Sequence, residues 1–185
     1  PGLWMLVGKN GCGKSTLMKL IKGILKPTDG CIKRPQNLSL VFQNPDHQIL
    51  MPTCGSELIL SIKESFSTRV IDKKVRQCLA LVGLEGFHKR PIHTLSGGQK
   101  QRLAIASALI SESNFILMDE PTAFLDQLSR IQIIEIIKSL IQNEKRPITV
   151  LWITHRLDEL VYANKVSVMK MGKLSSWQDP RKFKI

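Results

Sequence analysis

The sequence predicts an α/β fold in which helices cover both faces of a parallel β-sheet. Short apolar runs that fit buried strands alternate along the chain with segments of helical periodicity. A glycine-rich turn joins the first strand to the first helix, and a later strand ends in two acidic residues. Hydrophobic residues make up 43% of the 185 residues, so the chain can bury one core of ordinary size.

The strands are expected where apolar residues run without interruption, because a strand inside a parallel sheet is buried on both faces. Near the end of the chain, a turn at Gly172 predicts a hairpin over residues 166–174. The expected strands lie at residues 3–7, 39–42, 115–118 and 149–153, and they are apolar apart from Ser39 and Thr149 at the start of two of them.

The helices are expected where apolar residues recur every three or four positions. The first helix follows the glycine-rich turn, carries its stripe from Leu17 to Leu25 and is expected to end at Pro27. A later helix is expected to bury a stripe that includes Leu128 and Ile131. Helices after the first are expected at residues 99–110, 128–141 and 157–161.

Residues 51–95 differ in character, since they contain no convincing strand pattern. A helical stripe formed by Val75, Cys78, Leu79 and Val82 ends at Gly83, a residue type that commonly caps helices. We interpret this region as a mostly helical insertion within a single domain of 185 residues.

Composition limits the classes of protein that the chain can represent. No apolar run reaches the ~18–20 residues of a membrane-spanning helix, so any work at a membrane is done from its side. The net charge of +12 suits polyanions, but the basic residues are dispersed as on a lysine-rich solvated surface, and no specific nucleic-acid contact is expected. The four cysteines form no C-x-x-C pair, which argues against a zinc site or a disulfide framework.

Residues 8–15 (GKNGCGKS) fit the pattern G-x-x-x-x-G-K-[S/T] of a phosphate-binding loop between a strand and a helix. Backbone N–H groups can surround phosphate oxygens only in unusual conformations, which explains the glycines, and the helix start adds positive charge. Lys14 is expected to reach the β- and γ-phosphates, and the Ser15 hydroxyl to bind Mg²⁺. The alternative is a glycine-rich turn without a ligand. The residues expected to contact ATP are Gly8, Asn10, Gly11, Cys12, Gly13, Lys14, Ser15 and Thr16.

The strand at residues 115–118 leads directly into Asp119 and Glu120. Ligands of such sheets bind at the carboxyl ends of the strands, so Asp119 should lie at the same edge as the phosphate loop and help to hold Mg²⁺. Glu120 is then the candidate that polarises the attacking water. For Glu120, an ordinary solvated turn carboxylate remains the alternative.

Residues 95–99 (LSGGQ) decide the family. With the two nucleotide motifs on either side, this segment resembles the signature of ATP-binding-cassette (ABC) ATPases. The resemblance implies that Ser96, Gly97, Gly98 and Gln99 cover the γ-phosphate held by a second subunit in a head-to-tail dimer. A serine N-cap before a helix would explain the segment locally, but not the order of all the motifs.

Three more residues match this family. Gln43 resembles the Q-loop glutamine, Asp126 the aspartate of the D-loop at residues 122–126, and His155 the switch histidine. The resemblance therefore implies that Glu120, His155 and Gln43 are catalytic and that Ser15, Gln43 and Asp119 hold Mg²⁺. It also implies a P-loop NTPase fold with a RecA-like core (residues 1–50 and 96–185) and a helical subdomain (about residues 51–95).

Two features depart from the family pattern. The antiparallel sheet that usually precedes the phosphate loop, with an aromatic residue that stacks on adenine, has no counterpart in residues 1–7. Phe124 occupies a D-loop position where small residues are common, and it is expected to alter packing across the dimer seam.

Short segments favour one branch of the family. A resemblance to energy-coupling-factor ATPases, the paired cassettes of vitamin, cobalt or nickel importers, is carried by residues 43–48 (QNPDHQ) and 94–102 (TLSGGQKQR). Within that branch, the cyanobacterial and chloroplast members are most similar at residues 42–52, 122–126 and 152–160. This resemblance implies two partners, a second identical or different ABC ATPase subunit and a transmembrane coupling subunit. The implied location is peripheral, on the cytoplasmic side of the plasma membrane or in the chloroplast stroma or envelope.

Two alternatives stay open. A soluble ABC ATPase of iron–sulfur assembly, translation or DNA repair would suit the basic charge. A regulatory module with a dead site is disfavoured by the intact set of Lys14, Ser15, Asp119, Glu120 and His155.

Overall fold

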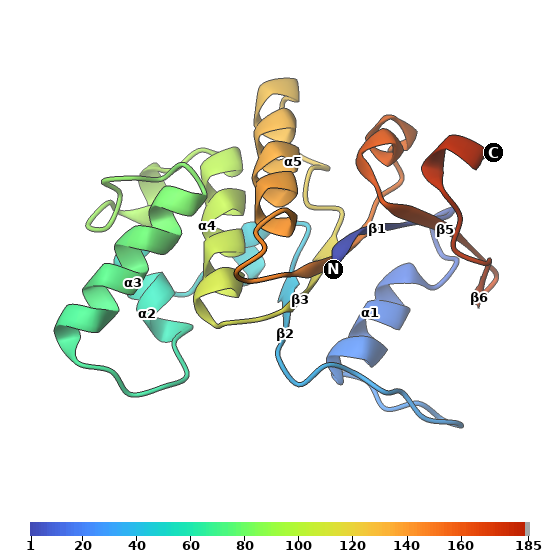
Figure 1. Cartoon of the computed structure of the whole chain (residues 1–185), viewed down its shortest axis with the longest axis horizontal. Coiled ribbons are helices and arrows are strands. Elements are labelled where there is room, and N and C mark those ends of the chain that lie inside the picture. Colours follow the sequence, from blue (N-terminus) through green and yellow to red (C-terminus); the bar gives the residue numbers. More distant parts are fainter. Residues whose placement is uncertain (184–185) are drawn as a thin grey trace.

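A six-stranded sheet forms the centre of the computed structural model, which describes residues 1–183 (Figure 1). Residues 184 and 185, which the sequence assigned to the core, lie outside the described part. In the order β2-β3-β4-β1-β5-β6, neighbouring strands are parallel except for the antiparallel hairpin β5-β6. The expected α/β fold is confirmed. The strands are β1 (Gly2–Val7), β2 (Leu38–Val41), β3 (Phe115–Asp119), β4 (Thr149–Ile153), β5 (Lys165–Lys170) and β6 (Lys173–Leu174).

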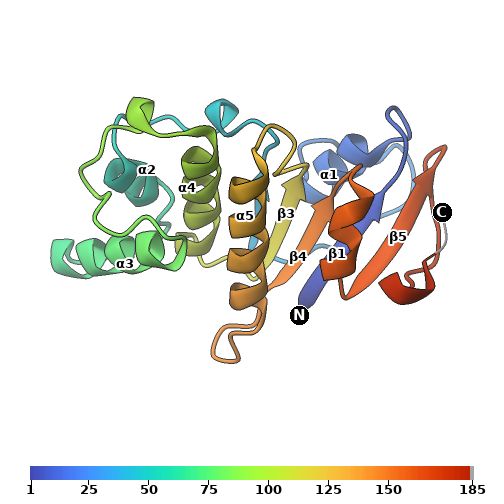
Figure 2. The same cartoon turned by 90° about the horizontal axis from the view of Figure 1, so that it is seen from above.

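Helices pack on both faces of this sheet, and the views in Figures 1 and 2 agree on this arrangement. The helix α1 covers one face, whereas α4 and α5 cover the other. The α-helices are α1 (Lys14–Lys22), α2 (Cys54–Leu60), α3 (Thr68–Leu81), α4 (Gly97–Ile110) and α5 (Gln127–Ile141). Short 3₁₀ helices are η1 (Pro45–His47), η2 (Ile92–Thr94), η3 (Leu157–Tyr162) and η4 (Pro180–Lys182).

Successive residues of the central strands face opposite sides of the sheet, and both sides are buried, which explains the continuous apolar runs. On β3, Ile116 and Met118 join the buried cluster under α4 and α5, whereas Leu117 joins the cluster that contains Met18 of α1. On β4, Trp152 faces the first cluster and Leu151 the second. Because both faces are covered, β3 and β4 are apolar except at one end each, where Asp119 and Thr149 stand.

The end of the first helix differs from the expectation. The helix α1 ends at Lys22 rather than continuing to Pro27, and Gly23 caps it in the left-handed conformation (φ 84°). The N–H of Gly23 donates to the carbonyls of Leu20 and Lys19, which is a common glycine C-cap arrangement. Leu25, expected on the buried stripe, is consequently 42% exposed.

The stripe on α5 also differs from the expectation. The helix has the expected extent, but Leu128 and Ile131 are 67% and 41% exposed. The first turn of α5 lies beside the start of α4 instead of on the sheet, since Ser129 packs directly against Gly98. The buried face of α5 is formed by Ile133, Ile134, Ile137 and Leu140.

Residues 51–95 contain α2, α3 and η2, and the expected helical stripe with its end at Gly83 is confirmed. Within the described residues 1–183, no helix combines the length and the apolar character that crossing a bilayer requires.

Candidate functional site

The strand order brings four loops to one edge of the sheet. Strands β1 to β4 are parallel, so the segments that follow them leave from their carboxyl ends at the same side. The phosphate loop follows β1, Gln43 follows β2, Glu120 follows β3 and His155 follows β4. This edge is where ligands of parallel α/β sheets bind.

The phosphate loop needs glycine for two separate reasons. Gly13 has φ of 106°, a left-handed conformation that residues with a Cβ rarely adopt. A Cβ on Gly8 would lie 2.4 Å from the carbonyl oxygen of Met169, so the loop passes too close to β5 for any side chain. The backbone can therefore curve tightly ahead of α1.

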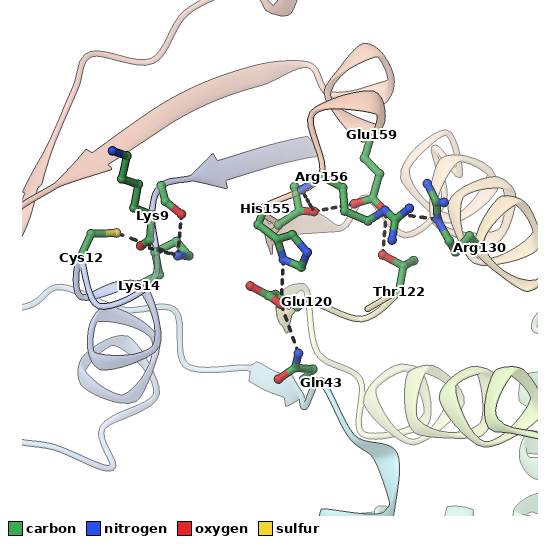
Figure 3. Close-up of polar contacts among 12 residues, drawn as sticks. Lys9, Cys12, Lys14, Gln43, Glu120, Thr122, Arg130, His155, Arg156 and Glu159 are labelled. Carbon is green, nitrogen blue, oxygen red and sulfur yellow. Dashed lines mark hydrogen bonds and ion pairs between the residues drawn. The ribbon is translucent and has the colours of Figure 1, made fainter. Parts of the chain in front are cut away.

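Lys14 lies inside this curve (Figure 3). Its side chain is buried, and Nζ donates hydrogen bonds to the carbonyl oxygens of Gly8 at 2.8 Å and Lys9 at 3.0 Å. The sulfur of Cys12 lies 4.0 Å from the same nitrogen. A buried ammonium at the N-terminus of a helix gives the loop a positive interior that suits a phosphate group.

Two cavities flank the loop and hold the predicted residues. A cavity of about 400 Å³ joins the loop to Gln43, Asp119 and Glu120, and one of about 1210 Å³ joins it to Gln43, Glu120 and His155. Leu157, Val168 and Phe183 are among the apolar residues that line the larger cavity. All eight residues predicted to contact ATP line one or both cavities, namely Gly8, Asn10, Gly11, Cys12, Gly13, Lys14, Ser15 and Thr16.

Glu120 lies at the meeting point of three loops (Figure 3). Its Oε2 atom accepts a hydrogen bond from Nε2 of Gln43 at 3.1 Å and lies 3.0 Å from Nδ1 of His155. The backbone of Glu120 has φ of 44°, which is uncommon for a residue other than glycine and which often marks functional sites. The structure thus brings together the three residues for which the resemblance implied catalysis.

Asp119 and Ser15 form a second contact at this edge. Burial raises the pKa of the Asp119 carboxyl, a hydrogen bond with Ser15 partly opposes this effect, and the neighbouring charge of Glu120 adds to it. Within residues 1–183, no three His, Cys, Asp or Glu side chains are grouped to hold a metal on their own. The donors present are a carboxylate, a hydroxyl and the Gln43 amide, which fit Mg²⁺ because this ion prefers oxygen ligands and is commonly shared with substrate phosphates.

The signature segment lies apart from the phosphate loop. In Figures 1 and 2, α4 and α1 lie on opposite sides of β3. Ser96 is the N-cap of α4, and it exchanges hydrogen bonds with Gln99 in a capping box, 3.3 Å from Gln99 N to Ser96 Oγ and 3.0 Å from Ser96 N to Gln99 Oε1. Ser96 and Gly97 are exposed, so this helix N-terminus is open to solvent.

The D-loop is fixed against the signature segment. Asp126 caps α5, accepting hydrogen bonds from the backbone N–H and the hydroxyl of Ser129 at 2.9 and 2.7 Å, and these bonds lower the pKa of its carboxyl. Ser129 in turn packs on Gly98, where a Cβ would lie 2.6 Å from its Oγ. Phe124, at the position where small residues were expected, is 74% exposed.

Sequence analysis did not single out a buried carboxylate beside this site. Glu159 of η3 is fully buried and accepts hydrogen bonds from the hydroxyls of Thr122 and Thr154. These three residues come from segments that meet only in the fold, and a short 3₁₀ helix has no periodic pattern from which burial could be inferred. The one signal in the sequence is an acidic residue next to Leu160 and Val161.

Comparisons with known proteins agree with this geometry. A family model described as ABC transporter matches residues 2–123. The chain is 43% identical over 176 residues to ABC transporter I family member 10 of Arabidopsis thaliana, covering 93% of this chain and 64% of that protein. It is 34% identical over 197 residues to the energy-coupling factor transporter ATP-binding protein EcfA1 of Streptococcus sanguinis, covering 98% and 70%. The chain thus spans less than two thirds of the Arabidopsis relative.

Solved structures show the same architecture. The chain superimposes with a TM-score of 0.87 and 30% identity on cbiO1 from Clostridium perfringens, part of the ABC transporter complex cbiONQ, covering 98% of this chain and 78% of that one. An ATP-binding cassette solved as a dimer in a post-hydrolysis state with ADP and Pi gives a TM-score of 0.79 at 29% identity, covering 98% and 87%. The chain therefore belongs to the ABC transporter family.

Proposed function

We propose that this chain is the ATP-binding and ATP-hydrolysing part of a subunit that powers an energy-coupling-factor type importer of a metal ion or vitamin. The observation that carries the proposal is the meeting of Gln43, Glu120 and His155 next to the phosphate loop. The likeness to an energy-coupling factor ATP-binding protein and to cbiO1 supports the type of transporter.

In this proposal, the phosphate loop binds the triphosphate of ATP. Lys14 exchanges its carbonyl partners Gly8 and Lys9 for the β- and γ-phosphate oxygens, to which an ammonium is attracted more strongly. Ser15, Asp119 and Gln43 would hold Mg²⁺, which when bound would neutralise negative charge of the triphosphate. The cation would stabilise the charged form of the partly buried Asp119 carboxyl, because burial otherwise disfavours its ionisation.

Glu120 acts on the attacking water. Both of its polar contacts use Oε2, so Oε1 is free of the contacts with Gln43 and His155 and can accept a proton from water. Gln43 and His155 fix the direction of the carboxylate, and His155 also faces the larger cavity beside the loop. General-base catalysis requires this kind of fixed acceptor.

Two copies of the cassette, identical or related, are proposed to form each complete site. The exposed N-terminus of α4 suits an anion, because the first N–H groups of a helix have no partner within the helix, but it lies apart from the phosphate loop of its own chain. A head-to-tail partner would bring Ser96 to Gln99 over the bound nucleotide, with Asp126 at the seam. The dimeric post-hydrolysis cassette supports this arrangement.

The membrane partner is proposed to contact the helical part. Residues 51–95 would form the helical subdomain and dock a transmembrane coupling subunit, while residues 1–50 and 96–185 form the RecA-like core. The subunit would then lie peripherally on the cytoplasmic side of the plasma membrane, or in the chloroplast stroma or envelope. No specific nucleic-acid partner is proposed.

The test uses the natural polypeptide with an affinity tag. We expect it to recover a multi-span membrane protein from detergent extracts and to hydrolyse ATP, and we expect Lys14→Ala to abolish hydrolysis. Recovery of no membrane subunit from a preparation that still hydrolyses ATP would refute the transporter role. Nucleic-acid affinity that falls steeply with salt would favour the soluble class of ABC ATPases.

A further inference from the structure

A fully buried carboxylate lies to one side of the proposed catalytic residues (Figure 3). Glu159 of η3 is 0% exposed, and both of its oxygens are occupied. Oε1 accepts a hydrogen bond from the hydroxyl of Thr122 at 2.6 Å, and Oε2 accepts one from the hydroxyl of Thr154 at 2.7 Å. Both threonines are themselves buried, so water cannot replace either bond.

The two threonines belong to the loops that carry the proposed catalytic side chains. Thr122 follows Glu120 by two residues, and Thr154 immediately precedes His155. The hydroxyl of Thr154 also accepts a hydrogen bond from the backbone N–H of Arg156 at 3.0 Å, which closes the turn around His155. One carboxylate therefore connects the loop after β3 to the loop after β4.

Two arginines balance the buried charge. Arg130 of α5 and Arg156 each place Nε within 3.9 Å of Oε1 of Glu159, and both also pair with the exposed carboxylate of Asp158. Two guanidinium groups thus face two carboxylates. Since burying a carboxylate is costly and an apolar side chain could fill the same space, the retained charge points to a role beyond packing.

We propose that Glu159 is a positioning residue for ATP hydrolysis, an inference that rests on the proposed function. By holding Thr122 and Thr154 together, it sets the separation of the two loops at which the Glu120 carboxylate meets the His155 ring at 3.0 Å. Loss of either hydroxyl bond lets the two loops separate, and hydrolysis slows although the phosphate loop is untouched.

The experiment removes the two threonine hydroxyls one at a time in the natural polypeptide; at Thr154 this also removes the acceptor of the Arg156 N–H. Thr122→Val and Thr154→Val delete the donor with little change of shape, and Thr122→Ser and Thr154→Ser restore it. Since misplacement near the reacting atoms is costly, we expect each valine variant to lower kcat by about 10–100-fold, with KM changed by less than about twofold and with recovery in the serine variants. Asp158→Asn is the matched control, because it removes the exposed carboxylate on the same arginines.

A second readout needs no ATP hydrolysis. The ¹⁵N signals of the His155 ring in nucleotide-free protein report its contact with Glu120, and they should move in both valine variants but not in Asp158→Asn. Unmoved His155 signals, a kcat that stays within about twofold of the wild type, or an equal loss of kcat in Asp158→Asn would each overturn the inference. A wild-type protein that hydrolyses no ATP would instead count against the proposed function, and the His155 signals would still decide whether Glu159 positions the loops.

Discussion

Replacing Glu120 with glutamine tests the chemistry of the site most directly. The amide keeps the shape of the side chain and can still accept the hydrogen bond from Gln43, but it cannot take a proton from water. Loss of a general base typically slows a reaction by about 10²–10⁴-fold. At about 1.36 kcal/mol for each factor of ten, the change removes about 2.7–5.4 kcal/mol of transition-state stabilisation.

The structure also predicts what Glu120→Gln leaves unchanged. The phosphate loop and Lys14 make no hydrogen bond or ion pair with Glu120 within the described residues, so nucleotide affinity should be retained. The assay measures phosphate release and, separately, binding of a fluorescent ATP analogue. Glu112→Gln is a matched control, because Glu112 also has positive φ (58°) but is exposed and paired with Lys74.

If ATP closes two cassettes, the slow Glu120→Gln variant should also accumulate as a dimer on a sizing column with ATP. A kcat within about threefold of the wild type would refute the role of Glu120 as the base. Loss of nucleotide binding together with activity would show that the carboxylate supports the site structurally, which the separate contacts of Lys14 argue against.

Three further predictions concern neighbouring residues. Burial raises the pKa of Asp119, so the stability that its protonated form provides is lost as pH rises through the folded-state pKa. Asp119→Asn should therefore raise Tm of the nucleotide-free protein at pH 7, and this gain should disappear in acid. An equal gain in Tm at all pH values would contradict the prediction. Gly98→Ala places a methyl group 2.6 Å from Oγ of Ser129 and should lower the free energy of unfolding by about 1–3 kcal/mol in denaturant titrations. Gly97→Ala is the control, because its methyl group would lie 3.8 Å from its nearest neighbour. This control should change the free energy of unfolding by less than about 0.5 kcal/mol. Alkylation of Cys12 with N-ethylmaleimide should block ATP binding because the added group fills the larger cavity, and ATP should protect; equal inactivation of Cys12→Ala would show that another group reacts.

Much of the fold follows from two regularities of the sequence. Residues in the apolar runs face opposite sides in turn, as Ile116 and Leu117 show, and runs of this kind imply a sheet covered on both faces. Because the strands are parallel, the residues that follow them lie at the same edge of the sheet, where the carboxyl ends of the strands are. This is why Gln43 and His155 could be placed near Glu120, although 77 and 35 positions of sequence separate them from it.

The errors have physical causes that local patterns do not contain. Gly23 ends α1 early because its left-handed conformation satisfies carbonyl groups of the last turn, whereas the apolar spacing alone continues through Leu25. Leu128 matches the period of α5, but the neighbour of that first turn is α4 rather than the sheet. Glu159 was missed because its partners Thr122 and Thr154 meet only through tertiary structure.

The surroundings of the fully buried Glu159 and of the partly buried Asp119 predict different roles for these two carboxylates. Glu159 has both oxygens bonded and two guanidinium groups nearby, so its charge is compensated within the chain. For Asp119, burial outweighs the hydrogen bond with Ser15, and the adjacent Glu120 makes ionisation less favourable still. In the proposed site, a cation that binds with the nucleotide would favour the ionised form of Asp119, whereas the charge of Glu159 already faces two guanidinium groups. In this proposal, cation binding stabilises the edge of the sheet where Asp119 lies, while the hydrogen bonds of Glu159 hold the neighbouring loops in place.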